Sequence, residues 1–447
     1  MKTSIDWKKW VFGQKKPRMN VIIGAKKKKS FMLFMISYCM DNFLKIYHRS
    51  FVLFSALWLI FPKFSSLLII WLCLLTIYGA IKKQLVFKPN IILFAMMALF
   101  GIYLLSLFIH DAPLSNLKFL ENKLSLLILP LIFSFYPAKQ NEVIQLFRAH
   151  ITGCIVLILI AFYHSYQCSM EFGESLRCFS TTNFSQIHHP SYFSAFLLFS
   201  SVLLILDKRN RIVPHQTSRI VLFVATLLVQ WNLGSLAGFL IITLLVLSLP
   251  VLISMFEGGI KKVILSYSIL TILGISFVFT SKEIKADFSN ALSFVENYFE
   301  KPKEFIQSRT YPLQGNETRL ILWDVSTKIC LKHPLGVGLG NLDFYMQKEL
   351  LAVGHGQLAT RKNNPHNQFI QVTAELGLIG LILFGFIIIY LLVIALKQKR
   401  LILLSLALSF AVFCLFESMM QRQSGIIFFC FWFAVLSRLD KKNSFTL

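Results

Sequence analysis

The chain has 447 residues, of which 56% are hydrophobic and only 15% are charged, and its mean hydropathy is +0.65. This composition excludes an ordinary soluble protein, because soluble domains carry about 25% charged residues. The formal net charge of +24 would suit a nucleic-acid-binding protein. However, the excess lies in residues 1–34 and in short links between apolar runs, with no aromatic stacking platform beside it. We therefore expect no nucleic-acid partner.

Residues 1–34 form a basic arm that carries Lys or Arg at ten positions against one Asp. Such an arm is expected to lie against anionic lipid on the cytoplasmic side of a membrane. It does not resemble a signal peptide, because no small-residue cleavage site follows a short apolar core. Segment 31–46 is apolar but contains Asp41 and Lys45, so we predict that it is interfacial. Residues 1–50 are thus a cytoplasmic arm with an interfacial segment.

The later runs are apolar on all sides, and many approach the ~20 residues that a helix needs to cross a bilayer. They predict an all-α polytopic membrane protein with about twelve transmembrane helices, eleven or thirteen being compatible as well. The first two runs flank Pro62 and could be one broken helix. The expected spans are 51–62, 65–81, 91–109, 122–137, 142–163, 190–206, 219–232, 235–255, 262–280, 368–396, 400–417 and 424–438.

Positive charges in the short links predict the orientation of these spans. If the basic arm is inside, five further basic clusters also fall inside, as the positive-inside rule requires, and both termini are cytoplasmic. Two longer links then lie outside: a short loop (165–189) and a long loop (281–367), the latter between helices 9 and 10. The spans are thereby divided into regions 51–280 and 368–447. The inside clusters contain Lys82 and Lys83, Lys208, Arg209 and Arg211, Lys261 and Lys262, Lys397, Lys399 and Arg400, and Arg438, Lys441 and Lys442.

The long loop holds most of the polar residues that suggest chemistry. Arg319 and Trp323 lie four residues apart in a predicted helix over 317–331, and so share one face. The glycines Gly336, Gly338 and Gly340 follow, and the loop ends in Pro365-His366-Asn367. The glycines are not a phosphate-binding P-loop, because the Lys-Ser/Thr ending and the preceding strand are missing.

Taken together, these motifs resemble the O-antigen ligase and polymerase family. The resemblance implies the GT-C membrane glycosyltransferase fold, a polar loop late in the chain, and transfer of a lipid-linked polysaccharide. It covers most of the chain beyond residue 50. The motifs are Arg319-x3-Trp323, Pro334-x-Gly336-x-Gly338-x-Gly340, Pro365-His366-Asn367 and Glu375-Leu-Gly377 in the long loop and the next span, and Arg177-Cys-Phe-Ser and His188-His189-Pro190-Ser-Tyr192 around the short loop.

The resemblance implies an inverting transfer from undecaprenyl diphosphate to lipid A-core, on the periplasmic face of the bacterial inner membrane. His366 would be the general base that activates the acceptor hydroxyl, a role that suits an imidazole with a pKa near ~6.5. Alternatively, His366 only caps the next helix or binds a loop carbonyl. Asn367 would orient His366 or cap the helix. No cofactor is expected, and no metal, because the outer acids are scattered.

Arg319 and Arg177 come from different loops and could converge on the donor diphosphate. A guanidinium binds phosphate oxygens in bidentate fashion and stays charged at any working pH. Alternatively, these arginines contact lipid headgroups or pair with acids such as Glu317. His189 is a further candidate substrate contact.

The chain departs from many relatives at residues 234–237, where Gly-Ser-Leu-Ala replaces a Ser-Arg element. If that arginine binds phosphate in relatives, another residue must do so here. Arg177, Arg309 and Arg361 are candidates, and the sequence does not choose among them.

Other candidate substrate contacts have structural alternatives. Trp323 could stack on a sugar or anchor the loop at the membrane surface. Gly338 could bring the backbone close to the substrate or simply form a turn. Glu375, Glu417 and Arg422 could line the path of the acceptor or lipid, although we favour a structural pair between Glu417 and Arg422.

Two alternatives for the function remain. A polymerase would use the same donor with a second lipid-linked glycan as acceptor. A transporter of the same lipids would more often show paired halves with broken helices. A disulfide between Cys168 and Cys178 in the short loop is also left open.

Overall fold

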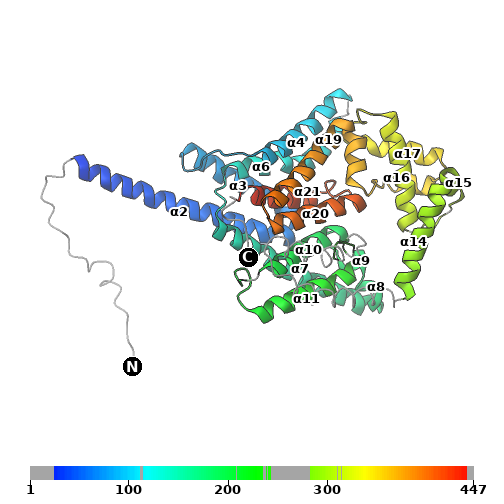
Figure 1. The fold of residues 1–447 in the computed structure, drawn as a ribbon, viewed down its shortest axis with the longest axis horizontal. Helices are drawn as coiled ribbons and strands as arrows, with labels where there is room; N and C mark the ends of the chain where they lie inside the picture. The colour runs from blue at the N-terminus through cyan, green and yellow to red at the C-terminus, as the bar shows by residue number, and fades with distance from the viewer. Residues whose placement is uncertain are drawn as a thin grey trace. The chain divides into compact units, whose positions relative to one another are not determined.

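The structure, a computed structural model, describes residues 25–110, 114–207, 209–234, 238, 240–242, 282–309, 311–313 and 315–439. The chain divides into two compact units, Met1–His48 and Arg49–Leu447. Helix α2 (Ala25–Ile60) begins in the first unit and ends in the second. All other elements named below belong to the second unit. The described residues form helices and no strand, as the composition predicts (Figure 1).

Long apolar helices identify a membrane protein. A helix satisfies its own backbone hydrogen bonds, which a segment in lipid requires. Within the described residues, five helical segments are long and apolar enough to cross a membrane: Asn42–Ile60 in α2, Pro62–Ile81, α4 (Ile91–Ile109), α7 (Gln140–Phe172) and α19 (Gln368–Lys397). Shorter apolar helices are α10 (Pro190–Leu206), α20 (Leu401–Phe416) and α21 (Gln423–Ser437).

The expected spans that these helices do not cover are 122–137, 219–232, 235–255 and 262–280. The break at Pro62 is real: α2 ends at Ile60, and the 3₁₀ helix η1 (Pro62–Phe64) precedes α3. Segment 31–46 lies within α2. Spans 235–255 and 262–280 fall almost entirely outside the described residues, so the count of twelve stays a prediction. The other described helices before residue 235 are α3 (Ser65–Ile81), η2 (Leu114–Asn116), α5 (Leu117–Lys123), α6 (Ser125–Phe135), α8 (Ser175–Cys178), α9 (Thr181–Phe184) and α11 (Gln216–Leu233).

The long loop is itself helical and has its own apolar core. Its helices are α14 (Lys282–Glu300), α15 (Pro302–Ser308), α16 (Gly315–Lys332), α17 (Leu342–Ala352) and α18 (Gly356–Thr360). Helix α16 confirms the helix predicted over 317–331. Its buried side chains Ile321, Leu322 and Val325 pack in one cluster with Met346 and Leu350 of α17. These helices lie together beside the start of α19, against which α16 packs (Figure 1).

The glycine series attaches the long loop to α19. Gly336, Gly338 and Gly340 all have φ near +85°, in the left-handed region that favours glycine. The backbone of this segment runs along α19: Val337 N donates to Ala374 O at 2.8 Å, and Gly338 N donates to Glu375 O at 3.0 Å. A Cβ on Gly336 would lie 2.5 Å from the Glu375 carbonyl. The glycines therefore serve close backbone packing.

Helix α19 is interrupted at Gly377, where φ is +70° and ψ is −164°. There Leu378 N donates to Pro334 O at 3.1 Å, so the segment that begins the glycine series packs against α19 at this interruption. We expect Gly377→Ala to destabilise the protein, because a positive φ costs a side chain about 1–2 kcal/mol and the Cβ would also collide with the backbone of Pro334 and Leu335. Thermal unfolding in detergent measures this as a lower Tm.

Gly385→Ala is the matched control in the same helix. A Cβ at Gly385 meets nothing within 4 Å. Alanine also has a higher helix propensity than glycine, by about 1 kcal/mol. The control should keep or raise the Tm, and an equal loss in both variants would contradict the packing role of Gly377.

Candidate active site

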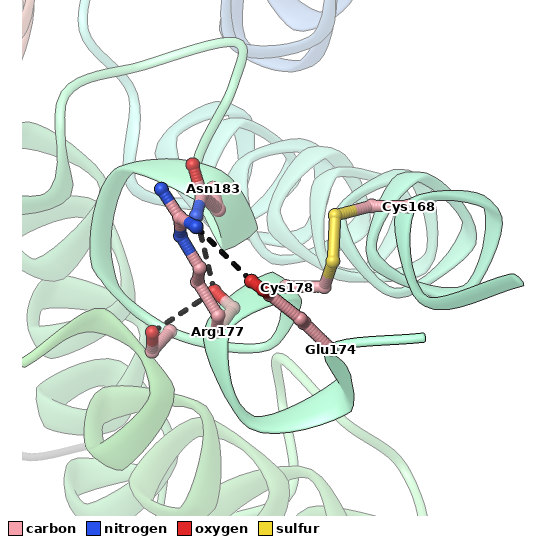
Figure 2. The surroundings of a disulfide bond; sticks show 6 residues. Cys168, Glu174, Arg177, Cys178 and Asn183 are labelled. Atoms are coloured by element: carbon pink, nitrogen blue, oxygen red, sulfur yellow. Dashed lines mark hydrogen bonds and ion pairs between the residues drawn. A yellow bond between two sulfur atoms is a disulfide. The ribbon is translucent and has the colours of Figure 1, made fainter. Parts of the chain in front are cut away.

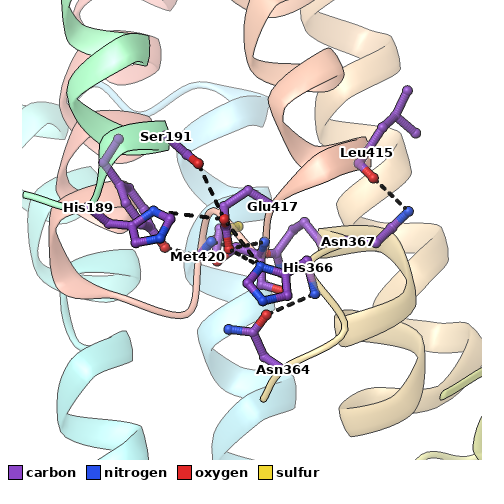
Figure 3. Close-up of polar contacts among 11 residues, drawn as sticks. His189, Ser191, Asn364, His366, Asn367, Leu415, Glu417 and Met420 are labelled. Atoms are coloured by element: carbon purple, nitrogen blue, oxygen red, sulfur yellow. Dashed lines mark hydrogen bonds and ion pairs between the residues drawn. The ribbon is translucent and has the colours of Figure 1, made fainter. Parts of the chain in front are cut away.

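A buried carboxylate lies at the centre of the polar residues. Glu417 follows the last residue of α20 and is only 4% exposed. His366 Nδ1 lies 3.2 Å and 3.3 Å from its two carboxylate oxygens. Ser191 Oγ donates to Glu417 at 3.3 Å, and His189 Nδ1 lies 3.9 Å away (Figure 3). We call Glu417, His366, His189 and Ser191 the His–Glu cluster. It joins the start of α10, the start of α19 and the end of α20.

The backbone around His366 is held in an unusual conformation. His366 has φ of +49°, which is uncommon for a residue with a side chain. Asn364 Oδ1 accepts a hydrogen bond from His366 N at 2.8 Å. Asn367 caps α19 by accepting from Phe369 N and Ile370 N, and it also donates to Leu415 O at 3.1 Å. The loop that carries His366 is thus tied to the end of α20 beside Glu417.

The proton of His366 has a defined position. A carboxylate only accepts hydrogen bonds, so the nitrogen that faces Glu417 carries the hydrogen. Nε2 of the neutral imidazole is then unprotonated and can accept a proton. The side chain of His366 is 26% exposed, so the ring is not sealed from a substrate.

Positive charge surrounds the cluster. Burial lowers the pKa of His189; Glu417 opposes this change, and the nearby charges of Arg422, His366 and Arg319 lower the pKa further. His189 is therefore neutral at pH 7. Arg319 also interacts electrostatically with Glu417. The guanidinium groups of Arg319 and Arg422 both lie within electrostatic range of His189, and positive charge of this kind favours an anionic ligand.

The structure brings together five of the residues selected from the sequence: His366, Asn367, His189, Arg319 and Arg422. The preferred pairing of Glu417 with Arg422 is not found. Among the described residues, the salt bridges of Glu417 come from His366 and His189. From the sequence, Glu417 was expected only to line the path of the acceptor or lipid or to pair with Arg422, and its contact with His366 was not predicted. The signal that could have identified it is an acid at the end of an apolar run, where an unpaired charge is costly.

Arg177 lies elsewhere, in the short loop. Its side chain is 75% exposed and forms a salt bridge of 3.0 Å with Glu174. Cys168 and Cys178 form a disulfide beside this pair (Figure 2). The disulfide that the sequence left open is therefore present. No described contact joins Arg177 to the His–Glu cluster.

The other candidate phosphate-binding arginines also have local partners. Arg309 forms a salt bridge of 3.1 Å with Glu317 and lies over the Phe305 ring. Arg361 lies over the ring of Tyr311, with 4.8 Å between the guanidinium carbon and the ring centroid. Arg319 and Arg422 are therefore the arginines that the structure associates with the cluster.

Three other selected residues have different surroundings. Trp323 lies one turn after Arg319 on α16, and its buried Nε1 has no hydrogen-bond partner among the described residues. Gly338 packs on α19 and lies close to His110. Glu375 is buried and accepts a hydrogen bond from Gln371 at 2.8 Å. Gly338 and Glu375 thus belong to the junction between the long loop and α19.

No metal site is apparent in the part of the chain that the structure describes. There, no group of three or more His, Cys, Asp or Glu side chains has an arrangement that could hold a metal ion. Of the two histidines beside Glu417, His366 lies within hydrogen-bond distance of the carboxylate and His189 lies beyond it.

Comparison with protein families gives one match. The family model described as O-antigen ligase matches residues 191–385. This segment contains Arg319, Trp323 and His366, whereas Glu417 and Arg422 lie beyond its end. A search of curated proteins found no match. The family match confirms the resemblance that the sequence motifs suggested.

Proposed function

We propose that this chain, which carries the O-antigen ligase domain at residues 191–385, transfers a polysaccharide from undecaprenyl diphosphate to lipid A-core. The reaction would take place on the periplasmic face of the bacterial inner membrane, in a GT-C-like protein with about twelve spans and both termini in the cytoplasm. The observation that carries the proposal is the His366–Glu417 pair with Arg319 and Arg422 nearby, in a membrane protein of this family.

His366 is the proposed general base. Its Nε2 takes the proton of an acceptor hydroxyl while that oxygen forms a bond to the anomeric carbon of the donor sugar. The bond from this carbon to the phosphate oxygen breaks, and undecaprenyl diphosphate leaves with inversion at the carbon. Glu417 holds the imidazole through Nδ1 and stabilises the imidazolium that forms. Ser191 holds Glu417 in turn by a hydrogen bond to its carboxylate.

Arg319 and Arg422 are the proposed ligands of the diphosphate. Negative charge grows on the bridging oxygen as the sugar leaves, and cations that are already in place stabilise it best in a site with little water. Both arginines are close enough to alter the pKa of His189. Arg319 lies on α16 and Arg422 directly before α21, so the two approach the cluster from different segments of the chain. Arg177 and Trp323, which have no described contact with the cluster, stay proposed substrate contacts.

Reconstitution tests the reaction and its acceptor. The purified protein in liposomes is incubated with labelled undecaprenyl-diphosphate-linked glycan, with or without lipid A-core, and products are separated by gel. We expect a labelled lipid A-core product that requires the acceptor. A ladder of longer glycans formed without lipid A-core would replace the ligase by a polymerase. Glycan that crosses the bilayer without any transfer would instead indicate a transporter.

A further inference from the structure

The turn of residues 417–422 carries both Glu417 and Arg422, and the backbone of its residue Met420 is held from two sides. Met420 N donates to Gln368 Oε1 at 2.6 Å, and Met420 O accepts from Lys123 Nζ at 2.5 Å. Met420 itself is fully buried. The turn is further tied at Ser418, whose carbonyl accepts from Tyr192 OH at 3.1 Å. The position of Glu417 therefore depends on side chains from α5, α10 and α19.

Lys123 is the unusual member of this set. Its side chain is buried, with only 2% of the residue exposed, at the end of α5. The ammonium lies 4.9 Å from the centre of the Tyr103 ring and interacts electrostatically with Glu375. No carboxylate forms a salt bridge with it among the described residues. Burial of an ammonium ion is costly unless its hydrogen bonds and charge are used. The steps of glycan transfer give this lysine no direct task.

We propose that Lys123 is a positioning residue for the candidate active site. Its ammonium binds the Met420 carbonyl and so holds the turn that places Glu417 against His366. This inference rests on the proposed function. Lysine suits the task because its long apolar stem tolerates burial while its head supplies donors to a buried carbonyl. Gln368 holds the same residue through its backbone N–H.

A double-mutant cycle with Lys123→Met and Glu417→Ala tests the inference in the reconstituted full chain. Methionine keeps the unbranched apolar stem but leaves the Met420 carbonyl without its donor. We expect Lys123→Met to lower kcat/KM for glycan transfer about tenfold. In the Glu417→Ala background the same substitution should lower it only about threefold or less, because the effects of two mutations are not additive when one residue acts through the other. An equal loss in both backgrounds, or no loss in a folded Lys123→Met protein, would overturn the proposal.

Lys118→Met is the matched control, because Lys118 lies on the same short helix α5 but is exposed. It should leave kcat/KM unchanged. If Lys123→Met does not fold, Gln368→Met removes the other backbone hydrogen bond of Met420, and the same loss of coupling is expected.

A second readout does not depend on activity. Diethyl pyrocarbonate modifies accessible imidazoles, and mass spectrometry of the peptide that contains His366 reports the rate. We expect faster modification of His366 in Lys123→Met than in wild type or Lys118→Met, because a loosened turn releases Nδ1. Unchanged reactivity in the folded variant would contradict the positioning role. Absence of transfer by the wild type would instead contradict the proposed function, so the two failures are distinguishable.

Discussion

His366→Ala is expected to lower the rate of glycan transfer by about 10²–10⁴-fold, the usual contribution of a general base. The loss follows from the geometry: Nδ1 is held by Glu417, and Nε2 is left to take the proton of the acceptor. The variant should still bind the donor, because Arg319 and Arg422 remain. The initial rate of labelled product formation in liposomes, at saturating donor, measures the effect on kcat.

His333→Ala is the control for this prediction. His333 lies in the same loop but packs against the ring of Tyr345, with 4.8 Å between the ring centroids. It has no described contact with the His–Glu cluster, so its loss should leave the transfer rate near that of wild type. Intact transfer by His366→Ala would remove His366 from the role of base.

Arg319→Ala is expected to reduce kcat/KM for the donor by about 10²–10³-fold, as the loss of one preorganised charge-stabilising group does elsewhere. Arg319 is partly buried on α16 and within electrostatic range of Glu417 and His189. Without it, the charge of Glu417 would weigh against an incoming diphosphate. Arg319→Lys should recover only part of the activity, because lysine keeps the charge but loses the planar bidentate fork.

Lys328→Ala provides the comparison for Arg319→Ala. Lys328 is also a cation on α16, but it forms a local salt bridge of 2.5 Å with Asp324. Its removal should leave donor kinetics unchanged, because this pair is local to α16 and no described contact joins it to the His–Glu cluster. If Lys328→Ala and Arg319→Ala lost activity equally, a general effect of charge on lipid binding would explain both, and the proposed diphosphate contact would be wrong.

The sequence was a good guide to local structure. Apolar runs predicted the positions of apolar helices such as α3, α4, α10 and α19, because hydrophobicity and helix length are properties of a single segment. Asn367 before α19 is a helix cap that can be predicted from the residue type alone. The helix that carries Arg319 was predicted too. The role of the glycines at 336–340 was not decided, because nothing in the segment itself indicates that α19 is interrupted at Gly377 to receive it.

The sequence predicted only some of the residues of the candidate site. His366, His189, Arg319 and Arg422 were selected, and the structure associates them with one cluster. Arg177 was expected to approach the same diphosphate, but the structure places it against Glu174, three residues before it. A motif reveals which residue types are available, whereas the direction of a loop depends on contacts along its whole length.

The sequence by itself determined the class of the protein, the positions of its apolar helices and the family motifs in the long loop. These follow from composition and local order, because a helix in lipid must satisfy its own backbone. Only the tertiary structure decided that Glu417 faces His366 and His189, and that Lys123 reaches the turn beside them. These contacts join residues far apart in the chain, and the packing of α5, α10, α19 and α20 alone determines which buried charges meet.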